Sequence, residues 1–199
     1  MKILKENSYD IVRLYVNQLG IMIFSMLLYT AVGSFENESL SRGLSVFVSV
    51  FSTCFYLVLV YYAMWEIGAK DKIRIDGGKM EPCKQKGFAM GLCANIPNFA
   101  LGFITAVLLG IFLLCGNDGV YAAFLIFNTV MRFHASMFLG FITEVIPSGL
   151  SAGKIDYIEF LVEAILFTVI PMLSVAVTHI AYSLGSNEKK IFSFLGTKK

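Results

Sequence analysis

The chain has 199 residues, of which 57% are hydrophobic and only 15% charged, and its mean hydropathy is +0.72. Soluble domains carry about 25% charged residues, so this composition excludes an ordinary soluble fold. The formal net charge is only +2 and no nucleic-acid-binding motif occurs, so we expect no nucleic-acid partner.

Five long apolar segments, separated by short polar breaks, fill almost all of the chain. Each is long enough to cross the hydrocarbon core of a bilayer, which takes about 20 helical residues. We therefore predict an all-α, polytopic integral membrane protein in which residues 1–199 form a single membrane domain. The segments are residues 11–33, 44–65, 88–115, 120–146 and 157–184.

The loop at residues 66–87, which follows the second segment, holds six lysines and arginines. The break at 34–43 holds one, and the break at 116–119 holds none. Because positive residues stay on the cytoplasmic side of a membrane, we expect the N-terminus and this basic loop to be cytoplasmic. The loop is expected to attract anionic lipid or to dock a soluble partner. Within it, Asp76-Gly77-Gly78 predicts a turn or a small hairpin.

The third segment carries small and polar residues on one helix face, at spacings of three and four. Small residues let helices approach closely in lipid, so we expect this face to pack against protein. Asn95 and Asn98 lie on the same face and need polar partners away from lipid. Pro97 lacks an amide donor and predicts a kink here, and Pro171 predicts another in the fifth segment. The predicted packing residues are Gly87, Gly91, Gly102, Ala106 and Gly110.

Arg132 interrupts the fourth segment near its middle, where an arginine costs about 2.5–3.5 kcal/mol. It must therefore reach an interface, face the bundle interior or pair with another group. Asn128 borders the same helix face. The candidate partners of the guanidinium are Glu144, Glu163, Asp10 and backbone carbonyls.

Two topologies fit the fourth segment. Arg132 divides it into pieces of about 12 residues, each roughly 18 Å long as a helix and too short to span alone. If the segment is re-entrant or interfacial, the chain makes four full spans and the lysine-rich tail lies inside. If the segment crosses, the chain makes five spans and the tail lies outside.

The sequence contains no motif that assembles a catalytic site. GxSxG, HExxH and CxxC are absent, and the four cysteines and two histidines lack metal-ligand spacing. We therefore predict no enzymatic activity, no catalytic residues, no metal and no cofactor. An intramembrane enzyme is a further alternative, and it would have to draw on Arg132, His134, Glu144 and Glu163.

The polar residues of the third and fourth segments suggest a binding function. We expect Asn95, Asn98, Asn128 and Arg132 to line one cavity near the Pro97 kink, with Arg132 facing an anionic group. This predicts a small-molecule transport or substrate-binding component of a plasma membrane, most simply a bacterial one. The alternative is an accessory or assembly subunit whose stripes pack against a larger membrane protein.

Overall fold

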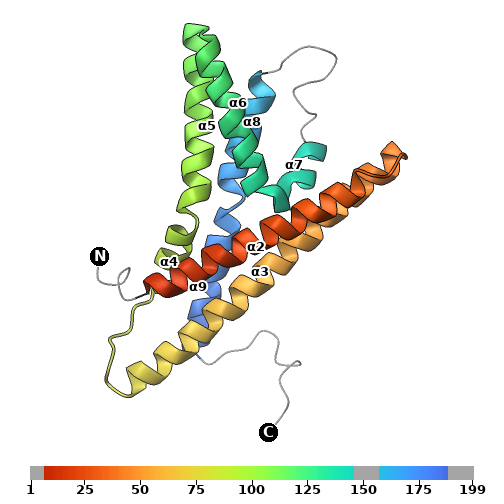
Figure 1. Cartoon of the computed structure of the whole chain (residues 1–199). Helices are drawn as coiled ribbons and strands as arrows, with labels where there is room; N and C mark the ends of the chain where they lie inside the picture. Colours follow the sequence, from red (N-terminus) through yellow and green to blue (C-terminus); the bar gives the residue numbers. More distant parts are fainter. Residues whose placement is uncertain (1–6, 146–156, 188–199) are drawn as a thin grey trace.

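The computed structural model describes residues 7–145 and 157–187, and in these ranges every regular element is helical (Figure 1). This confirms the predicted helical class. Four of the described helices are long and apolar enough to cross a membrane, and a bent pair at 118–143 would make a fifth if it counts as one span. The elements are α2 (Ser8–Val32), α3 (Glu38–Asp76), α4 (Lys86–Ala94), α5 (Ile96–Cys115), α6 (Asp118–His134), the 3-10 turn η1 (Ser136–Phe138), α7 (Leu139–Val145), α8 (Tyr157–Val169) and α9 (Met172–Ser186).

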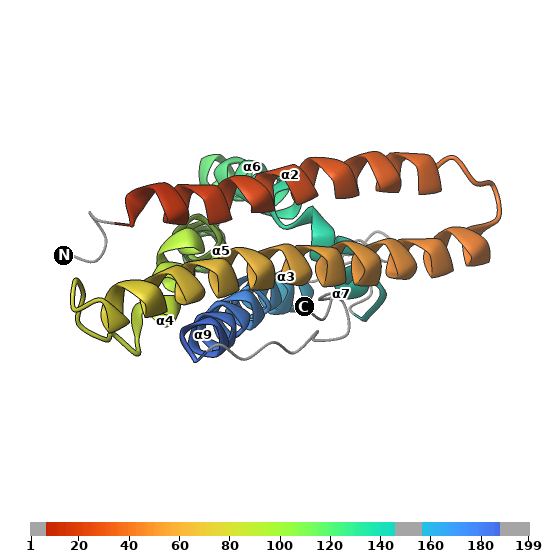
Figure 2. The same ribbon diagram turned by 90° about the horizontal axis from the view of Figure 1, so that it is seen from below.

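Two antiparallel helix hairpins and a third helix pair make up the fold. Helices α2 and α3 run side by side as one long hairpin (Figure 2), and α5 with α6 forms the second. The α8–α9 pair joins them, because α8 packs on α5 while α9 packs on α3 and α4. The two hairpins diverge away from α9, and α7 lies between their outer parts (Figure 1).

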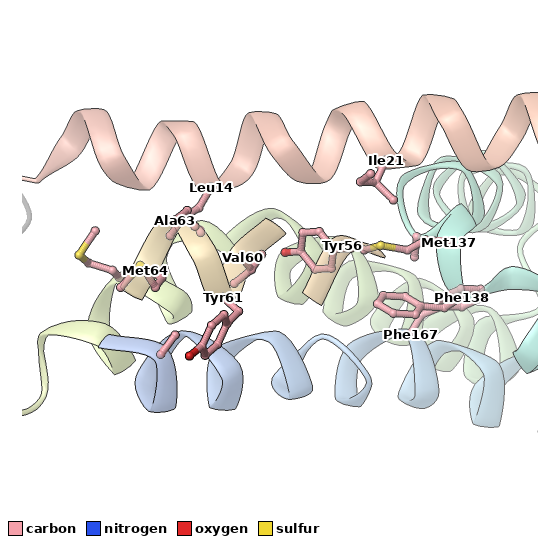
Figure 3. Packing of buried hydrophobic residues seen from close by; sticks show 14 of the residues in the cluster. Leu14, Ile21, Tyr56, Val60, Tyr61, Ala63, Met64, Met137, Phe138 and Phe167 are labelled. Carbon is pink, nitrogen blue, oxygen red and sulfur yellow. The ribbon is translucent and has the colours of Figure 1, made fainter. Parts of the chain in front are cut away.

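The main core lies where α2, α3 and α9 meet η1 and the end of α8. Leu14 of α2, Val60 and Met64 of α3, Met137 of η1 and Phe167 of α8 are all at most 2% exposed (Figure 3). The apolar contacts of this core pack the α2–α3 hairpin against α9.

Local sequence signals mark several helix ends. Asn37 accepts a hydrogen bond from the Leu40 amide at the start of α3, and Asn117 accepts one from the Gly119 amide at the start of α6. Such capping satisfies amides that a helix leaves free in its first turn. Gly116 ends α5 with a φ of 60°, a left-handed conformation that glycine adopts without strain.

The basic loop is shorter than the sequence suggested, because α3 continues to Asp76. The predicted turn at Gly77 and Gly78 is present, and Gly78 has a φ of 67°. The predicted hairpin was wrong, since helix rather than an extended strand precedes the turn. Charge pairs one turn apart support the added helix: Lys70 with Glu66 and Lys72 with Asp76, both at 2.7 Å.

Both prolines of the predicted kinks lie at helix breaks. Helix α4 ends at Ala94 and α5 begins at Ile96, so the break is at Asn95 and Pro97 occupies the first turn of the second helix. Helix α8 ends at Val169 and α9 begins just after Pro171. Proline is tolerated in a first helical turn because its missing amide would have no helical partner there.

The fourth apolar segment bends by 77° at Ala135, between α6 and η1. The amides of Gly140 and Phe141, at the start of α7, donate to the hydroxyls of Tyr29 (2.9 Å) and Ser49 (3.0 Å). These two hydroxyls also hydrogen-bond each other. Side chains from α2 and α3 thus cap the helix that follows the bend.

Helices α6 and α8 run in the same direction. Phe124 near the start of α6 contacts Phe160 near the start of α8, with ring centroids 5.4 Å apart. Further along both helices, Arg132 contacts Glu163. After the bend, α7 begins beside Tyr29 and Ser49.

Glycines allow close contact at three helix crossings, α3–α9, α4–α9 and α5–α8. A side chain at Gly185 would overlap the Trp65 carbonyl of α3, and one at Gly87 would lie 2.6 Å from Cβ of Tyr182. Gly91 and Gly102 similarly meet Thr178 of α9 and Thr168 of α8. Gly110, by contrast, has nothing within 4 Å, so the small-residue face contacts α8–α9 over only part of its length.

We predict that Gly185→Ala lowers the unfolding temperature, because overpacking costs typically about 1–3 kcal/mol and the overlapping atoms are backbone. Gly110→Ala is the matched control in α5. Its new methyl meets open space, so we expect an unchanged or slightly higher unfolding temperature. Thermal unfolding of the purified protein in detergent measures both, and equal effects of the two substitutions would contradict the close crossing.

Candidate functional site

Arg132 lies in the last turn of α6 and pairs with Glu163 of α8. Its Nη2 is 2.6 Å from Oε2 of Glu163, and the two side chains are 30% and 8% exposed. The guanidinium carbon is also 6.0 Å from the centre of the Phe160 ring. Glu163 is thus the partner of Arg132 among the candidates considered; the side chain of Glu144 lies outside those described.

The Arg132 side chain also forms part of the wall of a cavity of about 470 Å³, the Arg132 cavity. This cavity lies between α2, α6 and the bend that follows α6. Its lining mixes one guanidinium and four hydroxyls with apolar side chains, which is the composition expected of a small-molecule site. The lining residues are Met26, Tyr29, Thr30, Thr129, Arg132, Phe133, Ser136 and Leu139.

Asn95 and Asn98 lie elsewhere, in a closed network of hydrogen bonds. Gln18 of α2 and Asn98 exchange two bonds, of 2.8 and 3.1 Å, between their side-chain amides. Asn98 also donates to Oδ1 of Asn95 (2.9 Å), and Asn95 donates to Oγ of Ser174 (2.9 Å). All four residues are at most 4% exposed.

This network joins the two helix breaks. Asn95 donates back to the Gly91 carbonyl of α4, and Ser174 donates to the Pro171 carbonyl at the α8–α9 break, both at 2.8 Å. Asn95 and Ser174 thus each add a side-chain hydrogen bond to a carbonyl near one of the two prolines, beside the backbone amides that these carbonyls also accept. Their arrangement fits a packing role, because every donor and acceptor described above is used within the protein.

The structure thus separates the four predicted binding residues. Arg132 lines the Arg132 cavity, Asn95 and Asn98 belong to the closed network, and Asn128 lies one turn before Arg132 on α6. Asn128 is 5% exposed, and its Oδ1 has no hydrogen-bond partner. Substrate binding by these residues stays a prediction, now centred on Arg132 and Asn128.

A second cavity, of about 480 Å³, lies on the other side of the bend and is almost entirely apolar. It lies between α3 on one side and α7 and the α8–α9 break on the other. We refer to it as the apolar cavity. Its lining residues are Ser49, Val50, Thr53, Cys54, Phe138, Phe141, Val169, Ile170 and Leu173.

The end of the basic loop is buried rather than exposed. Lys86, the first residue of α4, places its Nζ 2.6 Å from Oδ2 of Asp71 in α3, and both side chains are at most 4% exposed. The hydroxyl of Tyr182 donates to the same oxygen at 3.0 Å. Lys86 therefore holds three helices together and is withdrawn from any lipid surface. Binding of anionic lipid by the rest of the loop stays a prediction.

Sequence reasoning missed the partners of these polar groups. Gln18 and Ser174 complete the carboxamide network, and Tyr29 caps the helix after the bend, but each lies far along the chain from the group it satisfies. Glutamine at position 18, buried in an apolar segment, is the one signal that could have been followed. Pairing across 80 residues cannot be read from spacing within one helix.

Comparison with known proteins gives no relative for this chain: no family model, no curated protein and no solved structure matches it.

We predict that Asn98→Leu lowers the free energy of unfolding by about 1–3 kcal/mol, because it leaves the buried Gln18 carboxamide without its partner. Adding Gln18→Leu should recover part of this loss, since removing both partners is nearly neutral. Gln85→Leu, at an exposed position, is the control. Chemical or thermal unfolding in detergent measures the wild type, both single variants, the double variant and the control, and strictly additive effects of Asn98→Leu and Gln18→Leu would contradict the network.

Proposed function

We propose that this protein is a non-enzymatic substrate-binding or transport component that takes a small polar molecule into the Arg132 cavity. The observation that carries the proposal is the position of Arg132, which combines a fixed guanidinium with a concave, partly apolar wall. Glu163 orients the guanidinium from α8. Arginine held in this way can present its remaining N–H donors to a carboxylate or another acceptor.

The hydroxyls of the cavity support a polar ligand rather than an apolar one. Tyr29 and Ser136 already bond to protein groups, which fixes their positions. Thr30 and Thr129 bond to carbonyls within their own helices, and their oxygens keep further acceptor capacity. A ligand would therefore meet a charged donor on one wall and fixed oxygens on the others.

We also propose a topology of four spans with a re-entrant fourth segment, in a multi-pass plasma-membrane protein. The parallel course of α6 and α8 supports it, because successive full spans alternate in direction. Exposed aromatic side chains support the membrane itself: Phe47, Phe51 and Phe55 stack along the outside of α3 at 6.2 Å intervals. An apolar surface of this kind is unusual for a protein in water.

An accessory or assembly subunit is the second candidate, and the apolar cavity favours it. Its lining has small residues on α3 opposite the bend and offers no charged group to a ligand. A side chain or helix of a larger membrane partner would fit such a surface. We rank this function second because it gives Arg132 and the hydroxyls of the other cavity no role.

We predict that small carboxylates such as acetate and succinate stabilise the protein and that Arg132→Gln removes this effect. Loss of a charged hydrogen bond should weaken apparent affinity by roughly tenfold or more. Arg132→Lys keeps the charge opposite Glu163 but not the fork of donors, so we expect weakened binding with preserved folding. Thermal unfolding against carboxylate concentration measures this. Arg42→Gln, at an exposed position, is the control, and loss of binding there would contradict the assignment.

The topology predicts that a reporter fused after Asn187 lies on the cytoplasmic side, as does one fused within the loop at 79–84. A reporter fused after Asn117, between α5 and α6, should lie on the opposite side. Paired fusions to green fluorescent protein, active inside, and alkaline phosphatase, active outside, distinguish the two sides. Phosphatase activity at position 187 would show that the fourth segment crosses.

A further inference from the structure

Buried polar atoms without partners gather where α6 meets α8. Among the described residues, three such acceptor oxygens lie on these helices: Oδ1 of Asn128, Oε2 of Glu159 and Oε1 of Glu163. Two nitrogens of α6 share their situation: Nε of Arg132, and Nε2 of His134, whose ring instead lies against Tyr15 of α2. Buried polar groups are satisfied in nearly all proteins, so a concentration of unsatisfied ones calls for an unseen partner.

Helix geometry places the three oxygens at the same contact. Phe124, Asn128 and Arg132 follow one another at intervals of four, and so share one face of α6. Phe124 and Arg132 both contact Phe160 of α8, so the face that includes Asn128 is turned toward α8. Glu159 and Glu163 are likewise four residues apart and share a face of α8. Asn128 itself is 95% buried, which makes its free oxygen the clearest sign of a missing donor.

The charges at this contact do not balance. Arg132 balances the charge of Glu163, whereas Glu159 has no ion pair among the described residues. Helices α5 and α9, which also pack on α8, contain no lysine, arginine, aspartate or glutamate. The missing partner should therefore be positively charged as well as a hydrogen-bond donor.

We propose that the α6–α8 contact binds the primary ammonium group of a small ligand. Such a group has one positive charge and three N–H donors, which matches one excess carboxylate and three free acceptor oxygens. The free Nε–H of Arg132 then donates a hydrogen bond to an acceptor oxygen of the same ligand. The substrate class is therefore small zwitterions or amino alcohols that carry an unmodified amine.

This inference rests on the proposed function and names the ligand that the Arg132 site would take. Arg132 connects the Arg132 cavity with the α6–α8 contact, because it lines the cavity and pairs with Glu163 of α8. A metal cation would neutralise the charge without using directed hydrogen bonds. A trimethylated amine would bring the charge without any N–H donor. These two probes therefore separate the requirement for charge from the requirement for donors.

The test measures thermal unfolding of the detergent-purified protein, in an amine-free buffer at constant ionic strength, against ethanolamine, choline and sodium chloride. We expect ethanolamine to raise the unfolding temperature in a saturable way, with choline and sodium having little effect. Glu159→Gln should raise the apparent dissociation constant for ethanolamine roughly tenfold or more. It leaves the Arg132–Glu163 pair intact, so folding is preserved. Asn128→Leu should also weaken the binding of ethanolamine. Glu38→Gln, at an exposed position, is the control and should leave ethanolamine binding unchanged.

Equal stabilisation by choline would overturn the proposal, because it would show that the N–H donors are irrelevant. Stabilisation by sodium alone would assign the oxygens to a metal cation instead. The absence of any saturable effect would indicate that water hydrogen-bonds to the oxygens, and it would also overturn the proposal. Ethanolamine has no carboxylate, so these results are independent of carboxylate binding at Arg132. Failure of the ammonium site with intact carboxylate binding would refute this inference and leave the proposed function standing.

Discussion

Satisfaction of polar groups inside apolar helices is the constraint on which this structure depends. Wherever a helix is interrupted, backbone amides or carbonyls lose their helical partners, and lipid offers no replacement. The protein answers with side chains from other helices. Tyr29 and Ser49 accept hydrogen bonds from the amides that follow the bend at Ala135, while Asn95 and Ser174 donate to carbonyls near the two proline breaks. The helix packing must bring these side chains to these places, so the interruptions determine which helices become neighbours.

The same constraint separates the two groups of buried polar residues. The network of Gln18, Asn98, Asn95 and Ser174 is closed, since each carboxamide donates to and accepts from a protein group. A closed network gives a rigid joint and offers nothing to a ligand. The contact between α6 and α8 is open, with unsatisfied atoms on both helices. Completeness of hydrogen bonding, rather than polarity or burial alone, is what makes the second group the better site.

The helical class and the approximate positions of the apolar segments could be predicted from the sequence, because segment length and hydropathy are local properties. The close approach at Gly87, Gly91 and Gly102 could be anticipated for the same reason, since spacing of four along one helix defines a face. Partners across helices were harder to predict: Glu163 was one of several candidates for Arg132, and most other pairs had no signal at all. Neither the pairing of Asn98 with Gln18 nor that of Lys86 with Asp71 has any local signature. The four polar residues that were expected to line one cavity therefore lie in two separate places.

The bend at Ala135 explains how an arginine is tolerated in the fourth segment. In a straight span Arg132 would lie at mid-helix, far from any helix end. Because α6 stops at His134, Arg132 instead occupies its last turn, where the negative end of the helix dipole favours a cation. Helix α8 runs parallel to α6 and brings Glu163 to the guanidinium. The break in the helix, the caps supplied by Tyr29 and Ser49, and the position of the charged pair are thus consequences of one departure from straight-helix geometry.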